Sequence, residues 1–271
     1  MTGREGPGRI SARLAELRNR GDKGLIAYLT AGDPDLVSTV TLALQLAEAG
    51  ADLIELGVPF SDPLADGPVI QEASRRALES GATVRGVLEA ARGIRRNSNI
   101  PLILMTYYNP VYQFGLETFA QAAVSAGVDG LIVPDLPLEE CAPLLEAGDG
   151  AGLDLIPLVA PTTTDKRLAG IAAAARGFIY CVSVTGVTGF REEIQTDMAK
   201  FTNRVREATS LPLAVGFGIS GPAGAARMAA HCDAVVVGSA FVKIVAAKGV
   251  QAGSEIAALA REIRAALKGA G

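Results

Sequence analysis

The sequence contains few of the side chains that metal sites and nucleophile-based enzymes require. It has one histidine, His231, three cysteines and no tryptophan. A histidine-dependent catalytic triad or a zinc site is therefore not expected. Cys141, Cys181 and Cys232 are isolated, odd in number and set among apolar residues, which indicates core thiols rather than a disulfide framework. We predict that the chain binds no metal ion.

Long apolar runs and basic clusters are also missing. No stretch approaches the ~20 apolar residues of a membrane span, and residues 1–9 lack the apolar core of a signal peptide. The net charge is −4, and no run of Lys or Arg is longer than the pairs Arg75-Arg76 and Arg95-Arg96. Nucleic-acid-binding proteins normally carry a basic stripe. These absences favour a cytoplasmic protein that binds neither nucleic acid nor membranes.

Apolar strand-like runs alternate with segments of helical periodicity. The expected strands are residues 25–29, 53–57, 102–105, 130–133, 155–159, 178–182, 213–216 and 234–238. The expected helices are residues 36–49, 69–80, 84–96, 116–126, 138–146, 166–175, 198–208 and 221–230. Strand then helix, eight times, predicts a (β/α)8 TIM barrel, and no linker divides residues 1–271 into separate domains.

The residues after and before the first expected strand also favour a barrel. Residues 30–34 (TAGDP) do not match the glycine fingerprint of a doubly wound dinucleotide-binding sheet, the other fold that alternation suits. Before the first strand, residues 1–20 predict an extra helix with Ile10, Leu14 and Leu17 on one face. We expect this helix to close the bottom of the barrel.

Residues 55–68 (ELGVPFSDPLADGP) place one carboxylate at the end of a strand and two in the following loop. Glu55 interrupts an apolar strand, and burial there would raise its pKa toward the range of a general acid or base. Asp66 lies in the next loop, at the rim where barrel enzymes hold their active sites. Asp62 and Asp135 are better explained by local turns or by an interface.

Three glycine-rich turns follow the last three expected strands, at residues 185–189, 216–220 and 238–240. The backbone N–H groups of such turns, beside helix N-termini, can hold a phosphate, and barrels often bind phosphate after strands seven and eight. The alternative is that they are only tight turns, with Ser220 and Ser239 as helix N-caps. Because no Lys or Arg lies in these turns, binding would use N–H groups and hydroxyls, which suits a phosphate monoester.

The remaining chemistry is proton transfer by carboxylates on a phosphorylated substrate, without an evident metal or redox cofactor. Lys243 lies in an apolar helix-like stretch, so no lysine at a strand end supports Schiff-base chemistry. Aromatic residues gather near the expected strand ends, where either a flat apolar ligand or core packing explains them: Tyr28, Phe60, Tyr107, Tyr108, Tyr112, Tyr180 and Phe217.

The motif at residues 55–68 resembles that of tryptophan synthase alpha chains. The resemblance covers nearly the whole sequence and continues at residues 29–34 (LTAGDP), 104–110 (LMTYYNP), 133–137 (VPDLP), 186–189 (GVTG), 216–220 (GFGIS) and 238–243 (GSAFVK). It implies the lyase reaction that splits indole-3-glycerol phosphate into indole and D-glyceraldehyde 3-phosphate by a retro-aldol cleavage.

The resemblance also implies roles for individual residues. Glu55 matches the acid that protonates indole C3, and Asp66 matches the carboxylate that accepts a hydrogen bond from the indole N–H. Thr188 matches a hydroxyl on a mobile loop whose closure orders Asp66. The phosphate site would comprise Gly189, Gly218, Gly238 and Ser239, and the indole pocket Tyr28, Tyr107, Ile132, Tyr180 and Phe217.

A partner is implied as well. Family members work in an α2β2 heterotetramer, in which indole passes to the pyridoxal phosphate of the beta chain, so we expect no cofactor in this chain. Asp62, Asn109 and Pro134 fall where the family contacts its beta chain. Val184 departs from the family because many members carry arginine there, and loop motion or partner coupling could differ as a result.

Three alternatives remain open from the sequence. The chain could be a standalone indole-3-glycerol phosphate lyase that releases free indole. It could be an isomerase or synthase acting on another phosphorylated sugar or indole precursor. It could also be a non-enzymatic activator of the beta chain, although loss of Glu55 or Asp66 would have favoured that reading and both are present.

Overall fold

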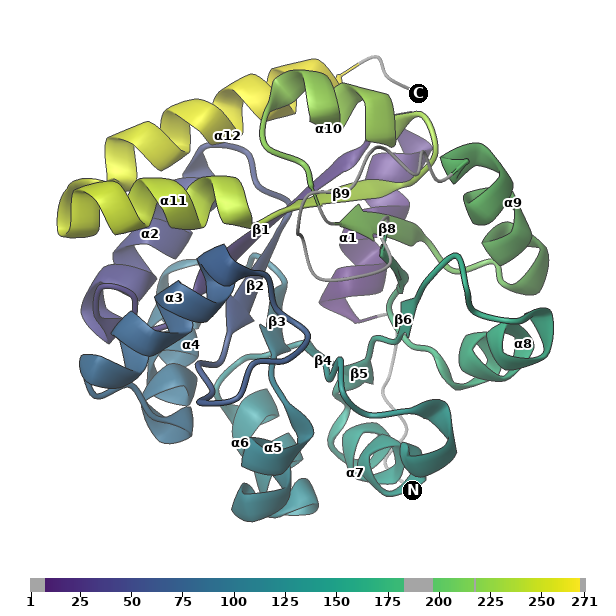
Figure 1. The fold of residues 1–271 in the computed structure, drawn as a ribbon, viewed down its shortest axis with the longest axis horizontal. Helices are drawn as coiled ribbons and strands as arrows, with labels where there is room; N and C mark the ends of the chain where they lie inside the picture. Colours follow the sequence, from purple (N-terminus) through teal and green to yellow (C-terminus); the bar gives the residue numbers. More distant parts are fainter. Residues whose placement is uncertain (1–7, 183–196, 217, 269–271) are drawn as a thin grey trace.

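Nine parallel strands form the sheet of the computed structural model, which describes residues 8–182, 197–216 and 218–268. Their order across the sheet is β5-β4-β3-β2-β1-β9-β8-β7-β6, and the pairing of β1 with β9 curls the sheet round (Figure 1). The strands are β1 Gly24–Thr30, β2 Leu53–Gly57, β3 Leu102–Met105, β4 Gly130–Ile132, β5 Asp154–Leu155, β6 Leu158–Val159, β7 Ile179–Val182, β8 Leu213–Gly216 and β9 Ala234–Val237.

The expected fifth strand, residues 155–159, is divided into β5 and β6. β5 pairs with β4 and β6 pairs with β7. Between them, Ile156 N–H donates to the Leu131 carbonyl at 2.9 Å, and the Pro157 carbonyl accepts from Tyr180 N–H at 3.0 Å. Pro157 has no N–H to continue the ladder, which accounts for the interruption. The two short strands together occupy one position in the ring, and the predicted (β/α)8 barrel is confirmed.

Helices surround the sheet, and most begin within two residues of their expected positions. They are α1 Arg9–Asn19, α2 Leu36–Glu48, α3 Pro68–Glu79, α4 Val84–Asn97, α5 Tyr108–Phe114, α6 Leu116–Ser125, α7 Ala142–Ala151, α8 Asp165–Ala174, α9 Met198–Ala208, α10 Pro222–Ala229, α11 Ser239–Lys248 and α12 Gly253–Leu267, with 3-10 turns η1 Leu138–Glu140 and η2 Gly249–Gln251. In the described ranges, none of these helices has the length and apolar character to cross a membrane.

Three helical regions differ from expectation, and one of them is α12, which lies outside every expected helix. The expected helix at residues 138–146 is a 3-10 turn, η1, followed by α7. The short helix α5 was not expected from periodicity. Its first N–H, on Tyr108, donates to the Asp135 carboxylate at 2.9 Å, so a side chain from another loop caps its start. Such a cap cannot be read from the local sequence.

Alternating strand residues supply two apolar cores. One core, which includes Ile54 and Leu56, lies between the strands and the helices. The other fills the barrel interior and includes Leu53 and Phe178 together with the buried face of α1. The residues of α1 in this interior core are Ile10, Leu14 and Leu17, which confirms that the helix closes the barrel.

The buried Asp52 and Asp129 and the half-buried Asp233 tie neighbouring strands together at their amino-terminal ends, the end opposite the predicted site. Each carboxylate accepts the first or second N–H of an adjacent strand: Leu25 N–H to Asp52 at 2.8 Å, Leu102 N–H to Asp129 at 2.9 Å and Leu213 N–H to Asp233 at 2.8 Å. His231 lies at this end too, in the turn between α10 and β9. It is therefore remote from the carboxyl ends of the strands.

Candidate active site

Glu55 lies near the carboxyl end of β2 and faces the barrel interior. Its neighbours in register are Tyr28 on β1 and Ile103 on β3. The residue is 1% exposed, and its Oε2 atom has no hydrogen-bond partner among the described residues. Burial raises the pKa of its carboxyl to about 8, and the nearby charge of Asp66 adds to the shift. Glu55 is therefore protonated at neutral pH and able to donate a proton.

Asp66 lies in the loop between β2 and α3 and is also buried. Burial raises the pKa of its carboxyl to about 6, while a hydrogen bond from Tyr107 opposes the rise. The Tyr107 hydroxyl donates to Asp66 Oδ2 at 3.1 Å and accepts from Ala65 N–H at 2.9 Å. Asp66 is therefore largely ionised at pH 7. Glu55 has the higher pKa because it is more deeply buried and because the charge of Asp66 acts on it, whereas the Tyr107 hydrogen bond opposes the rise at Asp66.

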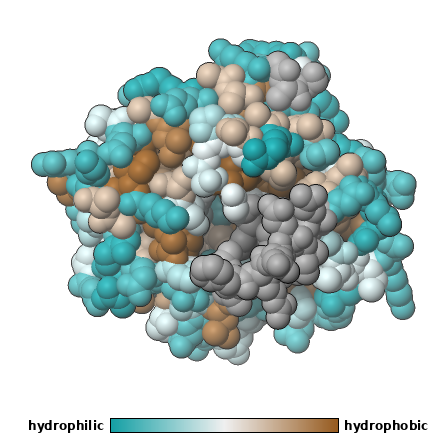
Figure 2. Space-filling view, turned by 45° about the horizontal axis from the view of Figure 1, so that its top comes forward, coloured by the Kyte–Doolittle hydropathy of each residue, from teal (hydrophilic) through white to brown (hydrophobic). Residues whose placement is uncertain are grey.

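Both carboxylates line one cavity of about 520 Å³ at the carboxyl ends of the strands. Figure 2 shows a hollow near the middle of the surface that it presents. The predicted residues that meet in this cavity are Glu55, Asp66, Tyr28, Tyr180, Gly218, Gly238 and Ser239. The structure therefore brings the acidic pair, two aromatic residues and two of the three glycine-rich turns to one site.

Two tyrosines occupy the cavity because glycines stand beside them. A Cβ atom added to Gly57 would lie 2.0 Å from the Tyr28 hydroxyl, and one added to Gly216 would lie 2.2 Å from the Tyr180 hydroxyl. Both distances are far below van der Waals contact, so each ring lies across a glycine at the end of the neighbouring strand. Both rings are buried, and burial is the main cause of the raised pKa of each tyrosine. The charge of Asp66 and then that of Glu55 add to the rise at Tyr28, and the charge of Glu55 adds to it at Tyr180.

Two helix N-termini adjoin the other end of the cavity. α10 begins after Gly221 and α11 after Gly238, and neither helix has a side-chain cap. Ser220 and Ser239 are therefore not the N-caps that the tight-turn alternative assigned to them. The first N–H groups of each helix have no intrahelical partner, so they can bind an anion. Gly218, with a φ of +77°, makes the turn that leads into α10.

Several cavity residues were not identified from the sequence. Lys243 is the charged one, and its place four residues after Ser239 on α11 puts the two on one helix face. The four-residue spacing from Ser239 was the sequence signal that could have identified Lys243. An anion bound at the N-terminus of α11 therefore has a cation nearby, contrary to the expectation that only N–H groups and hydroxyls would bind it. The apolar walls gave no comparable signal; they include Val69, Ile70, Met105, Ile219, Val236, Ile244 and Leu259.

Other predicted residues lie elsewhere. Ile132 is fully buried in the barrel interior and does not line the cavity. Tyr107 contacts Asp66 but is likewise not among the lining residues. The positions Thr188, Gly189 and Phe217, together with Val184, lie outside the described residues.

The three positions expected at a partner interface follow successive strands, β2, β3 and β4. Asp62 and Asn109 are exposed and Pro134 is half-buried. Asp62 also accepts a hydrogen bond at its carboxylate from the Ser61 hydroxyl at 2.6 Å, and its carbonyl accepts one from Leu64 N–H at 2.9 Å. Leu64, in the same loop as Asp62, is 85% exposed. These loops present polar and apolar groups on the rim that carries the cavity.

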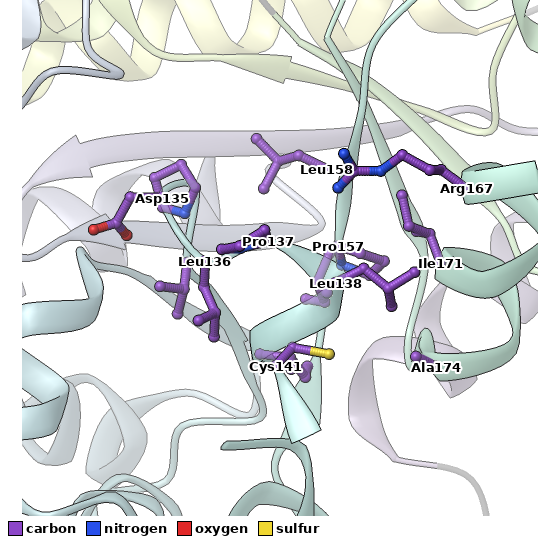
Figure 3. Close-up of a pocket in the computed structure, with 14 residues that line it drawn as sticks. Asp135, Leu136, Pro137, Leu138, Cys141, Pro157, Leu158, Arg167, Ile171 and Ala174 are labelled. Carbon is purple, nitrogen blue, oxygen red and sulfur yellow. The ribbon is translucent and has the colours of Figure 1, made fainter. Parts of the chain in front are cut away.

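A second cavity of about 440 Å³ lies beside this rim, between the loop after β4, the β5–β6 break and α8 (Figure 3). Leu136, Pro157 and Ile171 are among its apolar lining residues, and Arg167 is its basic one. The Arg167 guanidinium donates to the exposed Glu139 carboxylate at 3.0 Å. With its one cation paired, this cavity offers no cluster of catalytic groups.

The cysteines are free thiols, and two of them are buried. Burial raises the pKa of both Cys181 and Cys232 to about 12, which keeps them protonated. Cys141 is only half-buried and lines the second cavity, so the expectation of a core position is wrong for this residue. Within the described ranges no group of three or more His, Cys, Asp or Glu side chains is arranged to hold a metal ion.

Comparisons with known proteins agree with this geometry. The family profile of the tryptophan synthase alpha chain matches residues 14–269. A tryptophan synthase alpha chain of Citrifermentans bemidjiense is 54% identical over 87% of this chain and 88% of its own length. A tryptophan synthase alpha chain of Geobacter sulfurreducens is 47% identical over 96% of this chain and 98% of its own length.

Solved structures give the same result. A crystal structure of tryptophan synthase subunit alpha from Legionella pneumophila matches with a TM-score of 0.87 and 38% identity over 97% of this chain and 99% of that one. An aminoacrylate-bound tryptophan synthase structure from M. tuberculosis matches with a TM-score of 0.87 and 36% identity over 96% and 100%. The chain belongs to the tryptophan synthase alpha chain family.

Proposed function

We propose that this chain cleaves indole-3-glycerol phosphate into indole and D-glyceraldehyde 3-phosphate, as a lyase of tryptophan biosynthesis. The observation that carries the proposal is the pair of buried carboxylates, Glu55 and Asp66, in one cavity at the carboxyl ends of the strands. One is protonated and the other ionised at neutral pH, so the site can donate a proton and stabilise positive charge at once.

In this mechanism Glu55 protonates C3 of the indole ring, which makes the ring an electron acceptor. Asp66 accepts a hydrogen bond from the indole N–H and stabilises the positive charge that develops there. The glycerol hydroxyl next to the breaking bond loses its proton as the carbon–carbon bond cleaves, and its carbon becomes the aldehyde. The Glu55 carboxylate left by the first step is the adjacent base for that proton, so no net proton is consumed.

The two ends of the substrate meet different surroundings. Tyr28 and Tyr180 supply aromatic walls for the indole ring beside Glu55. The phosphate binds at the N-termini of α10 and α11, with Gly218, Gly238 and Ser239 closest to it. By the family resemblance, Gly189, Thr188 and Phe217 complete the site. None of these steps requires a cofactor in this chain.

We further propose that a tryptophan synthase beta chain is the partner, in an α2β2 assembly in the cytoplasm. The exposed Asp62 and Asn109 and the half-buried Pro134 are the candidate contacts, on the same rim as the cavity. Indole leaving the cavity would then pass to the beta chain, whose pyridoxal phosphate supports the second half-reaction. A standalone lyase is less well supported, because the matched relatives carry the tryptophan synthase alpha chain name.

The test is indole release from indole-3-glycerol phosphate by the purified chain, with and without a tryptophan synthase beta chain. Slow cleavage alone and strongly enhanced cleavage with the partner support the proposal. Fast cleavage that the beta chain does not change indicates a standalone lyase. No cleavage in either condition rejects the reaction.

A further inference from the structure

Gln71, in the first turn of α3, reaches back to the loop that carries Asp66. Its side-chain amide Nε2 donates to the backbone carbonyl of Asp66 at 2.9 Å and to that of Pro63 at 3.4 Å. The side chain does not cap its own helix, since the N-cap of α3 is Gly67 and no side-chain cap bond is present. Its hydrogen bonds are therefore directed at the loop and not at the helix.

The loop has few other attachments to the barrel near Asp66. Leu64 is 85% exposed, and Ala65 is exposed as well. Tyr107 holds the loop from the β3 side, through Ala65 N–H and the Asp66 carboxylate, and its ring stacks on Phe60 with centroids 5.2 Å apart. Gln71 holds it from the α3 side. The Asp66 side chain and the Asp66 backbone thus have separate holders on opposite elements.

We propose that Gln71 is a positioning residue, whose side-chain amide holds the Asp66 backbone so that the Asp66 carboxylate stays in the cavity beside Glu55. The inference rests on the proposed function for the role of Asp66. A hydrogen bond from a half-buried amide adds little net stability, because water replaces it in the unfolded chain. A displacement of about 1 Å in a catalytic group, by contrast, can cost about a hundredfold in rate.

The first experiment compares Gln71→Met with Gln121→Met. Methionine is similar in length to glutamine but has no N–H donor, and Gln121 is an exposed residue of α6 with no part in the site. In the full chain with its beta partner, Gln71→Met should lower kcat by about tenfold or more. The KM and the affinity for glycerol 3-phosphate should change less than about twofold, because the phosphate end of the site is untouched. Gln121→Met should match wild type. An unchanged kcat in Gln71→Met overturns the inference.

The pH profile separates positioning from a loss of folded protein. The titratable and charged groups around Asp66 in the cavity are Glu55, Tyr28, Tyr180 and Lys243, with Tyr107 at its carboxylate. If Asp66 is released, its pKa loses the rise due to burial, and its charge no longer raises the pKa of Glu55. Both limbs of the kcat/KM profile should then move to lower pH. A lowered Tm with unmoved limbs would indicate a merely structural role and overturn the inference.

Hydrogen exchange tests the same contact without the reaction. The Ala65 and Asp66 amides, which donate to Tyr107 and to the Pro63 carbonyl, should exchange faster in Gln71→Met while the β2 amides stay unchanged. Unaltered exchange in the loop refutes the positioning role. If wild type does not cleave indole-3-glycerol phosphate, the proposed function fails alone, because the exchange result still decides whether Gln71 holds this loop.

Discussion

Glu55 and Asp66 show how two carboxylates in one cavity acquire different protonation states. Both are desolvated, which raises the pKa of each. Asp66 receives a hydrogen bond from Tyr107, whereas Oε2 of Glu55 lacks a partner among the described residues. The charge of Asp66 further raises the pKa of Glu55. The carboxyl that the proposed mechanism uses as the proton donor is thus the one whose Oε2 has no hydrogen-bond partner among the described residues.

Glu55→Gln should abolish indole release, because the amide is nearly isosteric but has no transferable proton. It should also alter stability in a pH-dependent way. The folded pKa of Glu55, about 8, lies above its ordinary value of 4.5. Wild type therefore loses stability as pH rises through this window, since the unfolded chain ionises Glu55 first. The glutamine variant should not show this loss.

Urea unfolding at pH 5 and pH 9 measures the difference. The free energy of unfolding of Glu55→Gln relative to that of wild type should increase from pH 5 to pH 9 by an amount on the order of a few kcal/mol. Retained glycerol 3-phosphate binding is the control for an intact site. An advantage that is the same at both pH values would contradict the raised pKa.

Tyr107→Phe removes the hydroxyl that donates to Asp66 and accepts from Ala65 N–H, while Gln71 still holds the Asp66 backbone. Without the hydroxyl, the pKa of Asp66 should rise above its value of about 6, because the bond that lowers it is lost. The acidic limb of the kcat/KM profile should move to higher pH, opposite in direction to the effect expected of Gln71→Met. Tyr112→Phe, at a 61% exposed tyrosine, is the matched control and should leave the profile unchanged.

At the scale of elements, the cavity is shaped by two strands that end in glycine, which has no side chain. Gly57 ends β2 and Gly216 ends β8, and each leaves room for the tyrosine of a neighbouring strand. The buried tyrosines in turn form the walls beside Glu55. Glycine at these positions is required by close approach and not by backbone conformation, since neither has a positive φ.

Gly57→Ala should therefore displace Tyr28 and lower both activity and stability. Overpacking of this kind costs about 1–3 kcal/mol. The matched control is Gly150→Ala in α7, where an added Cβ meets nothing within 4 Å and alanine favours the helix. In chemical denaturation, the free energy of unfolding should be lower for Gly57→Ala than for wild type. For Gly150→Ala it should equal or slightly exceed the wild-type value. Wild-type stability in Gly57→Ala would mean that the tyrosine moves at no cost.

At the scale of the whole molecule, the barrel separates stability from chemistry between its two ends. The amino-terminal end is closed by α1 and held by buried aspartates that accept strand N–H groups. Asp129 also pairs with Arg9 and Arg95, each at 2.8 Å, and so joins α1 and α4 to the sheet. At the carboxyl end Asp33 pairs with Arg76 at 2.7 Å, whereas Glu55 and Asp66 form no ion pair among the described residues. The two carboxylates of the proposed site thus differ from Asp52 and Asp129, which are both paired with arginine.

Asp129→Asn should destabilise the chain by about 3 kcal/mol, because the half-buried Arg95 would lose its counter-charge. Asp149→Asn is the matched control: its pair with Arg176 is 46% and 41% exposed and is worth at most about 1 kcal/mol. Activity per folded molecule should be unchanged in both variants. Equal unfolding midpoints in the two variants would contradict the structural role of Asp129.

Much of this molecule follows from local sequence. Alternating apolar runs predict the strands, and helical periodicity predicts most helices. Glu55 is conspicuous because it places a charge in an apolar strand. The helix α1 is conspicuous because Ile10, Leu14 and Leu17 form one apolar face. These signals are readable because they repeat along the chain at the period of the element that carries them.

Only the tertiary structure decided the contacts between segments distant in sequence. It divided the fifth strand at Pro157, capped α5 with Asp135, and placed Ile132 in the barrel interior rather than at the cavity. It also brought Tyr107 and Gln71 to the loop of Asp66. The sequence determined which residues are available at the ends of the strands. Which of them touch depends on how the loops fold over the barrel, because hydrogen bonds between loops leave no periodic pattern in the sequence.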